Sequence, residues 1–469
     1  MPIPILSVPQ MREWERATWA TGQTEAEVIR RVGKRLARRA RRLTHPDDFI
    51  LILAGKGHNG DDARAAKEFL DERKVKVLEV LLPESDLPTL QLKLAEKPAL
   101  IIDGLFGVGL NRPLSKAWQQ IIATVNAAQL PILAVDVPSG LNAETGNHFG
   151  TAITATVTLT VGAPKAGLLA KAAAPFVGRL EVATEVGLIP CPLTAELNWI
   201  QAEDFAAFPP PRPAAGHKGS FGHVAIVAGS HGFHGAAVLA TRGAQRAQPG
   251  LTTLFTPESI YLPVAAQLQS AMVKVWQKEI SLPANTTAAL IGPGMADPEI
   301  CEPGKNFARR LWNEAAFPVV ADASALDWLE PQPAVPDTRV ITPHPGEAAR
   351  LLQTTTEAVQ VDRVRAVREL SQRFGGAWVV LKGSQTLIGR GEGPIFVNSS
   401  GNPQLAQGGS GDLLGGFIAG LLAQPALAAD VARTLTYAVW QHGAAADQLQ
   451  ARRTNWIIED LANELGNAR

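Results

Sequence analysis

The chain has 469 residues, of which 46% are hydrophobic, and this length suggests roughly two or three domains. Its 44 Lys and Arg residues balance its 44 Asp and Glu residues, so the sequence lacks the net positive charge that attracts nucleic acid or anionic membranes. We therefore expect no nucleic-acid or membrane partner and a small polar substrate. The sequence has only two cysteines, far apart, which favours a reducing compartment. It has no apolar run of membrane-spanning length, and acidic residues near Met1 are not typical of a signal or transit peptide, so we expect a cytoplasmic protein.

The first patterned segment in chain order is a basic stretch between Arg30 and Arg42. Val32, Leu36 and Ala40 recur within it at helical spacing. The stretch therefore predicts an amphipathic helix with a solvated basic face rather than a binding patch for a polyanion.

From residue 49 to residue 187, short β-rich runs alternate with helix-patterned segments. This alternation predicts βαβ units and a parallel sheet, with ligand sites in the loops at the carboxyl ends of the strands. The predicted elements are strand FILILA (49–54), a helix from Asp62 to Glu72, and strands VKVLEVLL (75–82), ALIIDGLFG (99–107), ILAVDVPSG (132–140), TATVTLTVGAP (154–164) and GRLEVATEVG (178–187).

A proline-rich segment, FAAFPPPRPAAG (205–216), interrupts the pattern. Its prolines disfavour helix and sheet and favour a stiff extended connector. A second series of strands and helices follows, from HVAIVAGS (223–230) to a helical pattern between Asp430 and Leu449. We therefore expect an α/β protein with domains at 1–208 and 216–469 and a linker at 209–215.

The loop after the first predicted strand reads GKGHNG (55–60) and formally satisfies the GxGxxG pattern of dinucleotide-binding proteins. Asp61 and Asp62 follow at once and place negative charge at the helix start where a pyrophosphate would bind. The pattern therefore does not favour an NAD-dependent dehydrogenase.

Two further predicted strands end in polar residues, Asp103 in one and Asp136 with Ser139 in the other. Oxygen ligands from neighbouring loops suit a hard cation and acid–base chemistry. The alternative is that each acidic residue only caps the turn or helix that follows it.

Taken together, GKGHNGDD, DGLFGVGLNRP, DVPSGLNAETG and VGAPKAGLL resemble the amino-terminal domain of the NAD(P)HX epimerases, which has a Rossmann-like fold. The resemblance implies that Asn59, Asp103 and Ser139 hold K⁺ and that Asp136 contacts the substrate and acts in catalysis. The other implied substrate-binding residues are His58, Asn59, Gly60, Asp61, Asp62, Gly107, Val108, Gly109, Leu110, Asn111, Arg112 and Pro113.

One loop departs from that family's pattern. The family reads NNGGDG where this chain reads HNGDDA, so Asp61 replaces a glycine. A side chain there narrows the loop, and a carboxylate repels phosphate. A degenerate, binding-only amino-terminal half is therefore the alternative to an active epimerase.

The second half contains no P-loop but has a glycine-rich helix start, Gly408, Gly409, Ser410 and Gly411, followed by Asp412. Free backbone amides there suit the charge on a transferring phosphoryl group, and Asp412 can accept a proton from an attacking hydroxyl. The alternative is a flexible glycine turn beside a helix start. His344 and Lys382 also have simpler interpretations, as a hydrogen-bonded loop histidine and a surface ammonium.

With HKGSFGHVAIVAGS, IGPGM, TPHPGE and VVLKGSQT, this half resembles the ADP-dependent NAD(P)HX dehydratases of the ribokinase-like superfamily. The resemblance implies that Ala236, Gly294, His344 and Asp412 contact the hydrated nucleotide. The implied nucleotide-binding residues are Lys382, Gly383, Ser384, Gln385 and Thr386 together with Gly408, Gly409, Ser410 and Gly411.

The order of the halves resembles the bifunctional NAD(P)H-hydrate repair enzymes. This implies that the first half interconverts the R and S hydrates, that ADP phosphorylates the S hydrate with Mg²⁺ present, that Asp412 is the base, and that AMP and phosphate leave. We also expect a homo-oligomer. A ribokinase-like kinase of a small alcohol is an alternative that leaves TPHPGE and the first half unexplained. A pyridine-nucleotide sensor without catalysis is another.

Overall fold

The structure is a computed structural model that describes residues 2–276, 281–296, 302–331 and 337–468. The chain divides into two compact units, Ile3–Glu196 and Leu197–Arg469. We call them the amino-terminal and carboxyl-terminal units. In the described part of the chain, no helix combines the length and apolar character needed to cross a bilayer.

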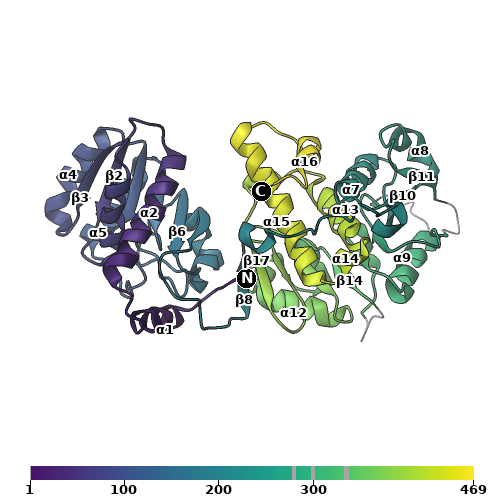
Figure 1. The fold of residues 1–469 in the computed structure, drawn as a ribbon, viewed down its shortest axis with the longest axis horizontal. Helices are drawn as coiled ribbons and strands as arrows, with labels where there is room; N and C mark the ends of the chain where they lie inside the picture. The colour runs from purple at the N-terminus through teal and green to yellow at the C-terminus, as the bar shows by residue number, and fades with distance from the viewer. Residues whose placement is uncertain (1, 277–280, 297–301, 332–336, 469) are drawn as a thin grey trace. The chain divides into compact units, whose positions relative to one another are not determined.

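The amino-terminal unit is built on a parallel sheet with strand order β3-β2-β4-β5-β6-β7. Alternate residues of β2 face opposite sides: Ile50 and Ile52 pack with α2 and α3, and Leu51 and Leu53 pack with α4 and α5. The unit is therefore a three-layer α/β/α sandwich, as the alternating pattern predicts (Figure 1). Its elements are β1 (Ile3–Pro4), α1 (Val8–Trp19), α2 (Glu25–Leu43), β2 (Phe49–Ala54), α3 (His58–Ala66), β3 (Lys74–Glu79), α4 (Pro83–Ala95), β4 (Leu100–Gly104), α5 (Lys116–Ala127), β5 (Ile132–Val135), β6 (Val157–Val161), α6 (Ala174–Val177) and β7 (Arg179–Ala183).

Helix α2 contains the basic stretch and confirms the predicted amphipathic helix. Thr24 and Glu27 form a capping box at its start. Its apolar face is buried against the sheet, and three arginines on the other face pair with Glu68, Glu181 and Glu185. Part of the helix's positive charge is thus balanced within the unit.

The predicted helix from Asp62 to Glu72 is displaced in the structure. α3 begins at His58, and a short 3₁₀ turn, Lys67–Phe69, follows it. The glycine-rich sequence itself forms the first helical turn, because Gly60 packs directly on the carbonyl of Gly55: a Cβ on Gly60 would lie 2.1 Å from that oxygen. A glycine cluster read as a loop is here the start of the helix.

The carboxyl-terminal unit contains a larger sheet with strand order β8-β17-β16-β15-β14-β13-β12-β9-β10-β11. The strands from β15 through β11 in this order are parallel, and β16 is antiparallel to both β15 and β17. The strands are β8 (Leu197–Ile200), β9 (His223–Val227), β10 (Leu251–Thr256), β11 (Met272–Val275), β12 (Ala288–Ile291), β13 (Val319–Ala321), β14 (Arg339–Ile341), β15 (Trp378–Leu381), β16 (Leu387–Gly389) and β17 (Ile395–Asn398). The helices are α7 (His234–Arg246), α8 (Glu258–Ala265), α9 (Glu302–Glu314), α10 (Pro345–Leu351), α11 (Thr356–Val361), α12 (Arg363–Arg373), α13 (Ser410–Leu422), α14 (Pro425–Ala428), α15 (Val431–Arg452) and α16 (Ile458–Glu464).

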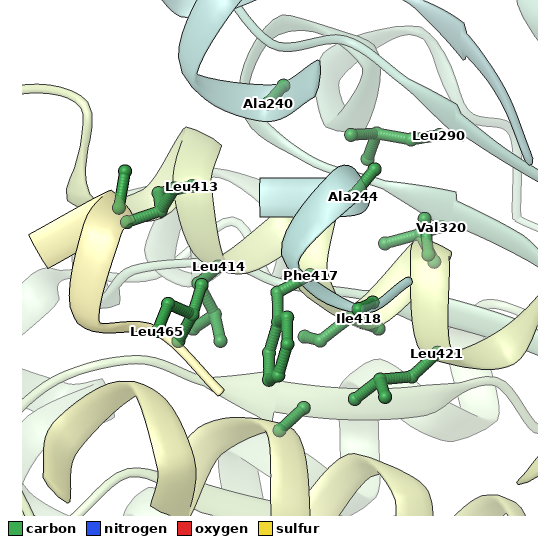
Figure 2. Packing of buried hydrophobic residues seen from close by; sticks show 14 of the residues in the cluster. Ala240, Ala244, Leu290, Val320, Leu413, Leu414, Phe417, Ile418, Leu421 and Leu465 are labelled. Carbon is green, nitrogen blue, oxygen red and sulfur yellow. The ribbon is translucent and has the colours of Figure 1, made fainter. Parts of the chain in front are cut away.

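Helix α13 is held in place by unusually close contact with α7. A Cβ on Gly416 would lie 1.8 Å from the carbonyl oxygen of Ala240, and one on Gly243 would lie 2.1 Å from that of Leu413. Leu413 to Leu422 are all buried, and Figure 2 shows Phe417 and Ile418 packed among apolar neighbours. Glycines at the crossing therefore fix the position of the helix that begins with Ser410.

The boundary between the units lies earlier in the chain than the proline-rich segment suggests. Strand β8 pairs in parallel with β17, and Phe205 packs against Tyr437 and Trp440. Residues 197–208, assigned from sequence to the first domain, are therefore part of the second compact unit. The following prolines, 209–211 and 213, are exposed and lie in neither helix nor strand.

Candidate active sites

In the amino-terminal unit, the loops after β2 and β4, the start of α3 and the helices α1 and α2 enclose a cavity of about 990 Å³. The structure brings most of the predicted substrate-binding residues to this cavity. They are His58, Asn59, Asp62, Gly107, Val108, Gly109, Leu110, Asn111, Arg112, Pro113 and Asp136. Gly60 lies beneath it in the α3 turn, packed on Gly55.

The three predicted K⁺ ligands converge on one turn, Leu105–Phe106. The Ser139 hydroxyl donates to Asp103 Oδ1 at 2.6 Å and accepts from the Phe106 amide at 2.9 Å, while Asn59 Nδ2 donates to the Phe106 carbonyl at 2.9 Å. Burial raises the pKa of Asp103 to about 6, although hydrogen bonds from Ser139 and Leu105 oppose this. An all-oxygen set with a single carboxylate matches the preference of a hard monovalent cation.

Asp136 is held in a strained conformation by a buried lysine. Its φ is +61°, a backbone conformation that residues other than glycine rarely adopt. Lys165 Nζ lies 2.5 Å from Asp136 Oδ1. The Lys165 ammonium also donates to Thr160 Oγ1 and to the Val161 carbonyl. Sequence analysis missed the role of Lys165, although it lies in the VGAPKAGLL motif directly after β6.

Two other carboxyl groups in this cavity are more basic than usual. Burial raises the pKa of Asp62 well above its ordinary value, and the nearby charges of Asp136, Asp61 and Glu15 raise it further. The pKa of Glu15 is raised chiefly by burial, with Lys165 opposing and Asp136 adding to the rise. Glu15 comes from α1, before the first predicted strand, so no local sequence signal connects it with the site.

Asp61, the departure from the epimerase pattern, does not line the cavity. It lies within α3 with ordinary helical backbone, so no left-handed conformation is needed at this position. Its carboxylate pairs with Arg64 at 2.7 Å, and Arg64 in turn pairs with Glu79. The Asp61 side chain therefore does not narrow the cavity, although the comparison with the family pattern led us to expect that it would.

In the carboxyl-terminal unit, the predicted anion cradle is the start of α13. Gly409 adopts the left-handed conformation (φ +92°), and no side chain caps the helix. Asp412 lies in the first turn, where burial and then the charge of Asp322 raise its pKa to about 6, with Lys382 opposing. A carboxylate that is ionised at neutral pH and more basic than usual lies beside uncapped amides.

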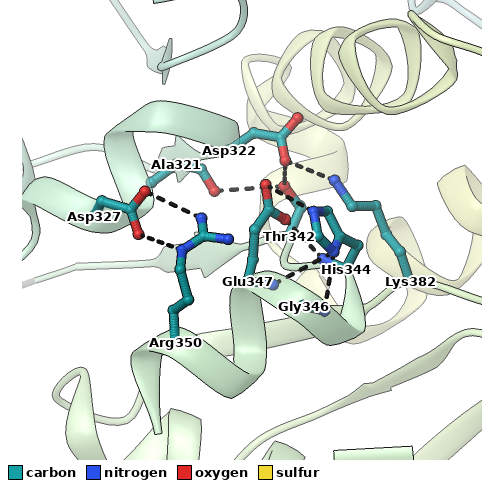
Figure 3. Close-up of polar contacts among 9 residues, drawn as sticks. All are labelled: Ala321, Asp322, Asp327, Thr342, His344, Gly346, Glu347, Arg350 and Lys382. Atoms are coloured by element: carbon teal, nitrogen blue, oxygen red, sulfur yellow. Dashed lines mark hydrogen bonds and ion pairs between the residues drawn. The ribbon is translucent and has the colours of Figure 1, made fainter. Parts of the chain in front are cut away.

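Lys382 is not a surface ammonium. Its Nζ lies 2.8 Å from Asp322 Oδ1, and the same oxygen accepts from Thr342 Oγ1 at 2.7 Å (Figure 3). Burial lowers the pKa of Lys382, but Asp322, Glu347 and Asp412 outweigh it and the net shift is upward. Sequence analysis missed Asp322, although it follows strand β13 in the same way that Asp136 follows β5.

The predicted nucleotide-binding turn, Lys382 to Thr386, is shaped by Arg363. The Arg363 guanidinium donates to the carbonyls of Ser384 and Gln385, and also to that of Leu381. Thr386 Oγ1 donates back to the Gly383 carbonyl at 3.0 Å. The turn is therefore preorganised, and Arg363 is a residue that the sequence reading did not find.

Three predicted contacts with the hydrated nucleotide remain: Ala236, Gly294 and His344. A Cβ on Gly294 would lie 2.5 Å from that of Ala236, so these two residues adjoin as expected. His344 caps α10: its Nδ1 accepts from the amides of Gly346 and Glu347, which is the simpler of the two interpretations (Figure 3). Its Nε2 lies 3.5 Å from Glu347 Oε1.

A second cavity of about 710 Å³ lies in the carboxyl-terminal unit beside the proline-rich segment and the carboxyl end of α13. None of the predicted site residues lines it. The charged residues Asp322, Lys382 and Asp412 instead lie at the amino end of α13.

Comparison with known proteins assigns both halves. The family model described as NAD(P)H-hydrate dehydratase matches residues 224–467, and the model described as YjeF-related protein N-terminus matches residues 83–167. The bifunctional NAD(P)H-hydrate repair enzyme of Gloeobacter violaceus is 35% identical, over 96% of this chain and 94% of that protein. That of Escherichia coli is 34% identical, over 94% of this chain and 89% of that protein.

Among solved structures, a ribokinase-like superfamily protein from Enterococcus faecalis is 24% identical, with a TM-score of 0.50, over 59% of this chain and 96% of that one. The ADP/ATP-dependent NAD(P)H-hydrate dehydratase of Bacillus subtilis, co-crystallised with ATP and Mg²⁺, is 30% identical, with a TM-score of 0.49, over 55% of this chain and 92% of that one. The α/β fold class predicted from the sequence is confirmed. From its curated relatives and its two domain matches, this chain belongs to the family of bifunctional NAD(P)H-hydrate repair enzymes.

Proposed function

We propose that this chain repairs hydrated NADH and NADPH, with the carboxyl-terminal unit as an ADP-dependent dehydratase and the amino-terminal unit as an epimerase. The observation that carries the dehydratase is the start of α13. There Asp412, with its pKa raised to about 6, adjoins uncapped amides and the paired Lys382. Base, anion cradle and fixed cation lie together, as transfer of a phosphoryl group to a hydroxyl requires.

In this mechanism the Asp412 carboxylate takes the proton of the hydroxyl at C6 of the hydrated nicotinamide ring. The hydroxyl oxygen bonds to the β-phosphorus of ADP, and the bond between that phosphorus and AMP breaks. The phosphate ester then leaves as inorganic phosphate while C5 loses a proton, which restores the ring double bond. Phosphorylation is needed because hydroxide is a poor leaving group at neutral pH.

In this unit, backbone amides and a lysine ammonium would bind the phosphoryl group during its transfer. The amides from Gly409 to Gly411 and the Lys382 ammonium would stabilise its negative charge, and the turn held by Arg363 would position the adenylate. Mg²⁺ would neutralise phosphate charge when bound. Among the described residues no cluster of three metal-ligating His, Cys, Asp or Glu side chains occurs, so we expect the ion to be held mainly by the nucleotide's phosphates.

In the amino-terminal unit we assign the exchange of R and S hydrates to the cavity that contains Asp62 and Asp136. Asp136, fixed by Lys165, would move a proton of the bound hydrate. Asn59, Asp103 and Ser139 would hold K⁺, which supplies a fixed positive charge beside the substrate. The placement of Asp61 outside the cavity supports an active rather than a degenerate site.

The test is to incubate the purified chain with hydrated NADH and ADP and to follow the return of absorbance from the reduced nicotinamide. We expect NADH, AMP and phosphate in equal amounts, and R-to-S exchange without ADP. A phosphorylated small alcohol formed instead would support the kinase alternative. Tight binding of the hydrate without any product would support the sensor.

A further inference from the structure

We propose that Asp322 is a positioning residue of the dehydratase site, holding the Lys382 ammonium at the start of α13 and placing its own negative charge next to Asp412. This inference rests on the proposed dehydratase function. It assigns a role to a buried carboxylate that is not itself expected to contact the substrate.

The Asp322 carboxylate is fixed in place by its neighbours. It follows strand β13, and its side chain is only 2% exposed. Its Oδ1 accepts from both Thr342 and Lys382, at 2.7 and 2.8 Å (Figure 3). Its Oδ2 faces α13, since a Cβ on Gly415 would lie 3.5 Å from it and one on Gly411 would lie 3.8 Å away.

The pair with Asp322 places the Lys382 ammonium beside α13. A Cβ on Gly411 would lie 3.2 Å from Lys382 Nζ, so the ammonium lies against the first turn of α13. Among the described residues, Asp322 is its one recorded side-chain partner, which leaves other N–H groups of the ammonium available. A phosphoryl group held by the α13 amides would lie within reach of this ammonium.

Charged groups from several elements surround Asp412. Asp322 after β13 and Glu347 on α10 favour the protonated form of Asp412, and Lys382 after β15 favours the ionised form. His442 on α15 adds little positive charge, because burial lowers its pKa to about 4. Among the neighbouring charges, that of Asp322 raises the pKa of Asp412 most.

The substitution Asp322→Asn tests this role because Asn keeps the size and can still accept from Lys382. We expect kcat to fall severalfold, with about tenfold as the upper limit, as for a general base made weaker. A neighbouring like charge typically shifts a pKa by about one unit, so the acidic limb of the pH profile of kcat/KM should move down by about that amount. The KM for ADP should change by less than kcat, because Lys382 remains.

Asp327→Asn is the matched control. Asp327 is a carboxylate in the 3₁₀ helix Ala323–Trp328 that Asp322 precedes, but it is half-exposed and pairs with Arg350 at 3.1 Å. This variant should retain kcat, KM and the acidic limb. Thermal unfolding of both variants would show that each is folded at the assay temperature.

A readout independent of activity separates this inference from the proposed function. The pKa of Asp412 can be followed by ¹³C NMR of carboxyl-labelled full-length chain, with the signal identified by its loss in Asp412→Asn. A downward shift in Asp322→Asn supports the inference even if the chain makes no NADH. An Asp412 pKa and an acidic limb that both stay unchanged would overturn it.

Discussion

Each unit places a buried lysine–aspartate pair at the carboxyl ends of its parallel strands, but the two units use the pair differently. In the amino-terminal unit Lys165 pairs with Asp136 after β5, and in the carboxyl-terminal unit Lys382 pairs with Asp322 after β13. The Lys165 ammonium has three partners within its own unit and is only 1% exposed. Lys382 has one side-chain partner within the described part of the chain and is 20% exposed. The first pair orients an aspartate, and the second leaves a cation that a phosphate can reach.

The helices beside these pairs show the same contrast. α3 and α13 both begin after a glycine without a side-chain cap, and each carries an aspartate of raised pKa near its start, Asp62 and Asp412. Both aspartates have acidic neighbours and one opposing ammonium, Lys165 at α3 and Lys382 at α13. Because Lys165 is enclosed by its own partners, the α3 site suits proton exchange, whereas the partly exposed Lys382 makes the α13 site suited to phosphoryl transfer.

The largest expected effect separates the two sites by activity. Asp412→Asn should lower dehydratase turnover by about 10²- to 10⁴-fold, because it removes the base. Binding of AMP, measured by calorimetry, and epimerisation should be nearly unchanged. Unimpaired dehydration in this variant would remove Asp412 from the mechanism.

A second pair of variants sharpens the contrast between the lysines. Lys165→Met leaves Asp136 buried without its cation, and breaking such a pair costs about 3–5 kcal/mol. Lys382→Met should cost less stability, because its site is partly exposed, but more dehydratase activity. Hydrogen exchange of peptides from each unit of the full-length chain measures the loss of stability in the two variants. Equal destabilisation of the two units would contradict the distinction.

A third comparison tests the support of the α13 cradle. Gly243→Ala places a methyl group 2.1 Å from the Leu413 carbonyl oxygen and should destabilise the carboxyl-terminal unit by about 1–3 kcal/mol. Gly235→Ala, on the same helix, meets no atom within 4 Å and is the control for stability. Calorimetry of both variants should show a lower melting temperature only for Gly243→Ala, while epimerase activity is retained. Equal melting would show that the helices can separate without cost.

The smallest expected effect concerns the residue that most disturbs the family pattern. Asp61→Ala removes a half-exposed ion pair with Arg64, which is typically worth about 0–1 kcal/mol. Because Asp61 does not line the cavity, the rate of R-to-S exchange should change by about twofold or less. A tenfold or larger change would place its carboxylate in the site after all.

Features specified by a few consecutive residues could be predicted from the sequence. Strand ends, the glycine-rich start of α13 and the position of Asp412 are readable because each is specified by a few consecutive residues. The contacts of Asp322, Arg363 and Glu15 are not, because each depends on segments distant in the chain. Strand β8 was missed because its pairing partner, β17, is distant in the chain, and the neighbouring prolines gave a stronger signal for the boundary.

The most direct test of the account starts from a mixture of the R and S hydrates of NADH with ADP. The account predicts that the wild-type chain restores all of the reduced-nicotinamide absorbance. Asp136→Asn should quickly restore only the share present as the S form, and Asp412→Asn should restore almost none. Recovery without any phosphoryl donor, or no recovery with one, would contradict it.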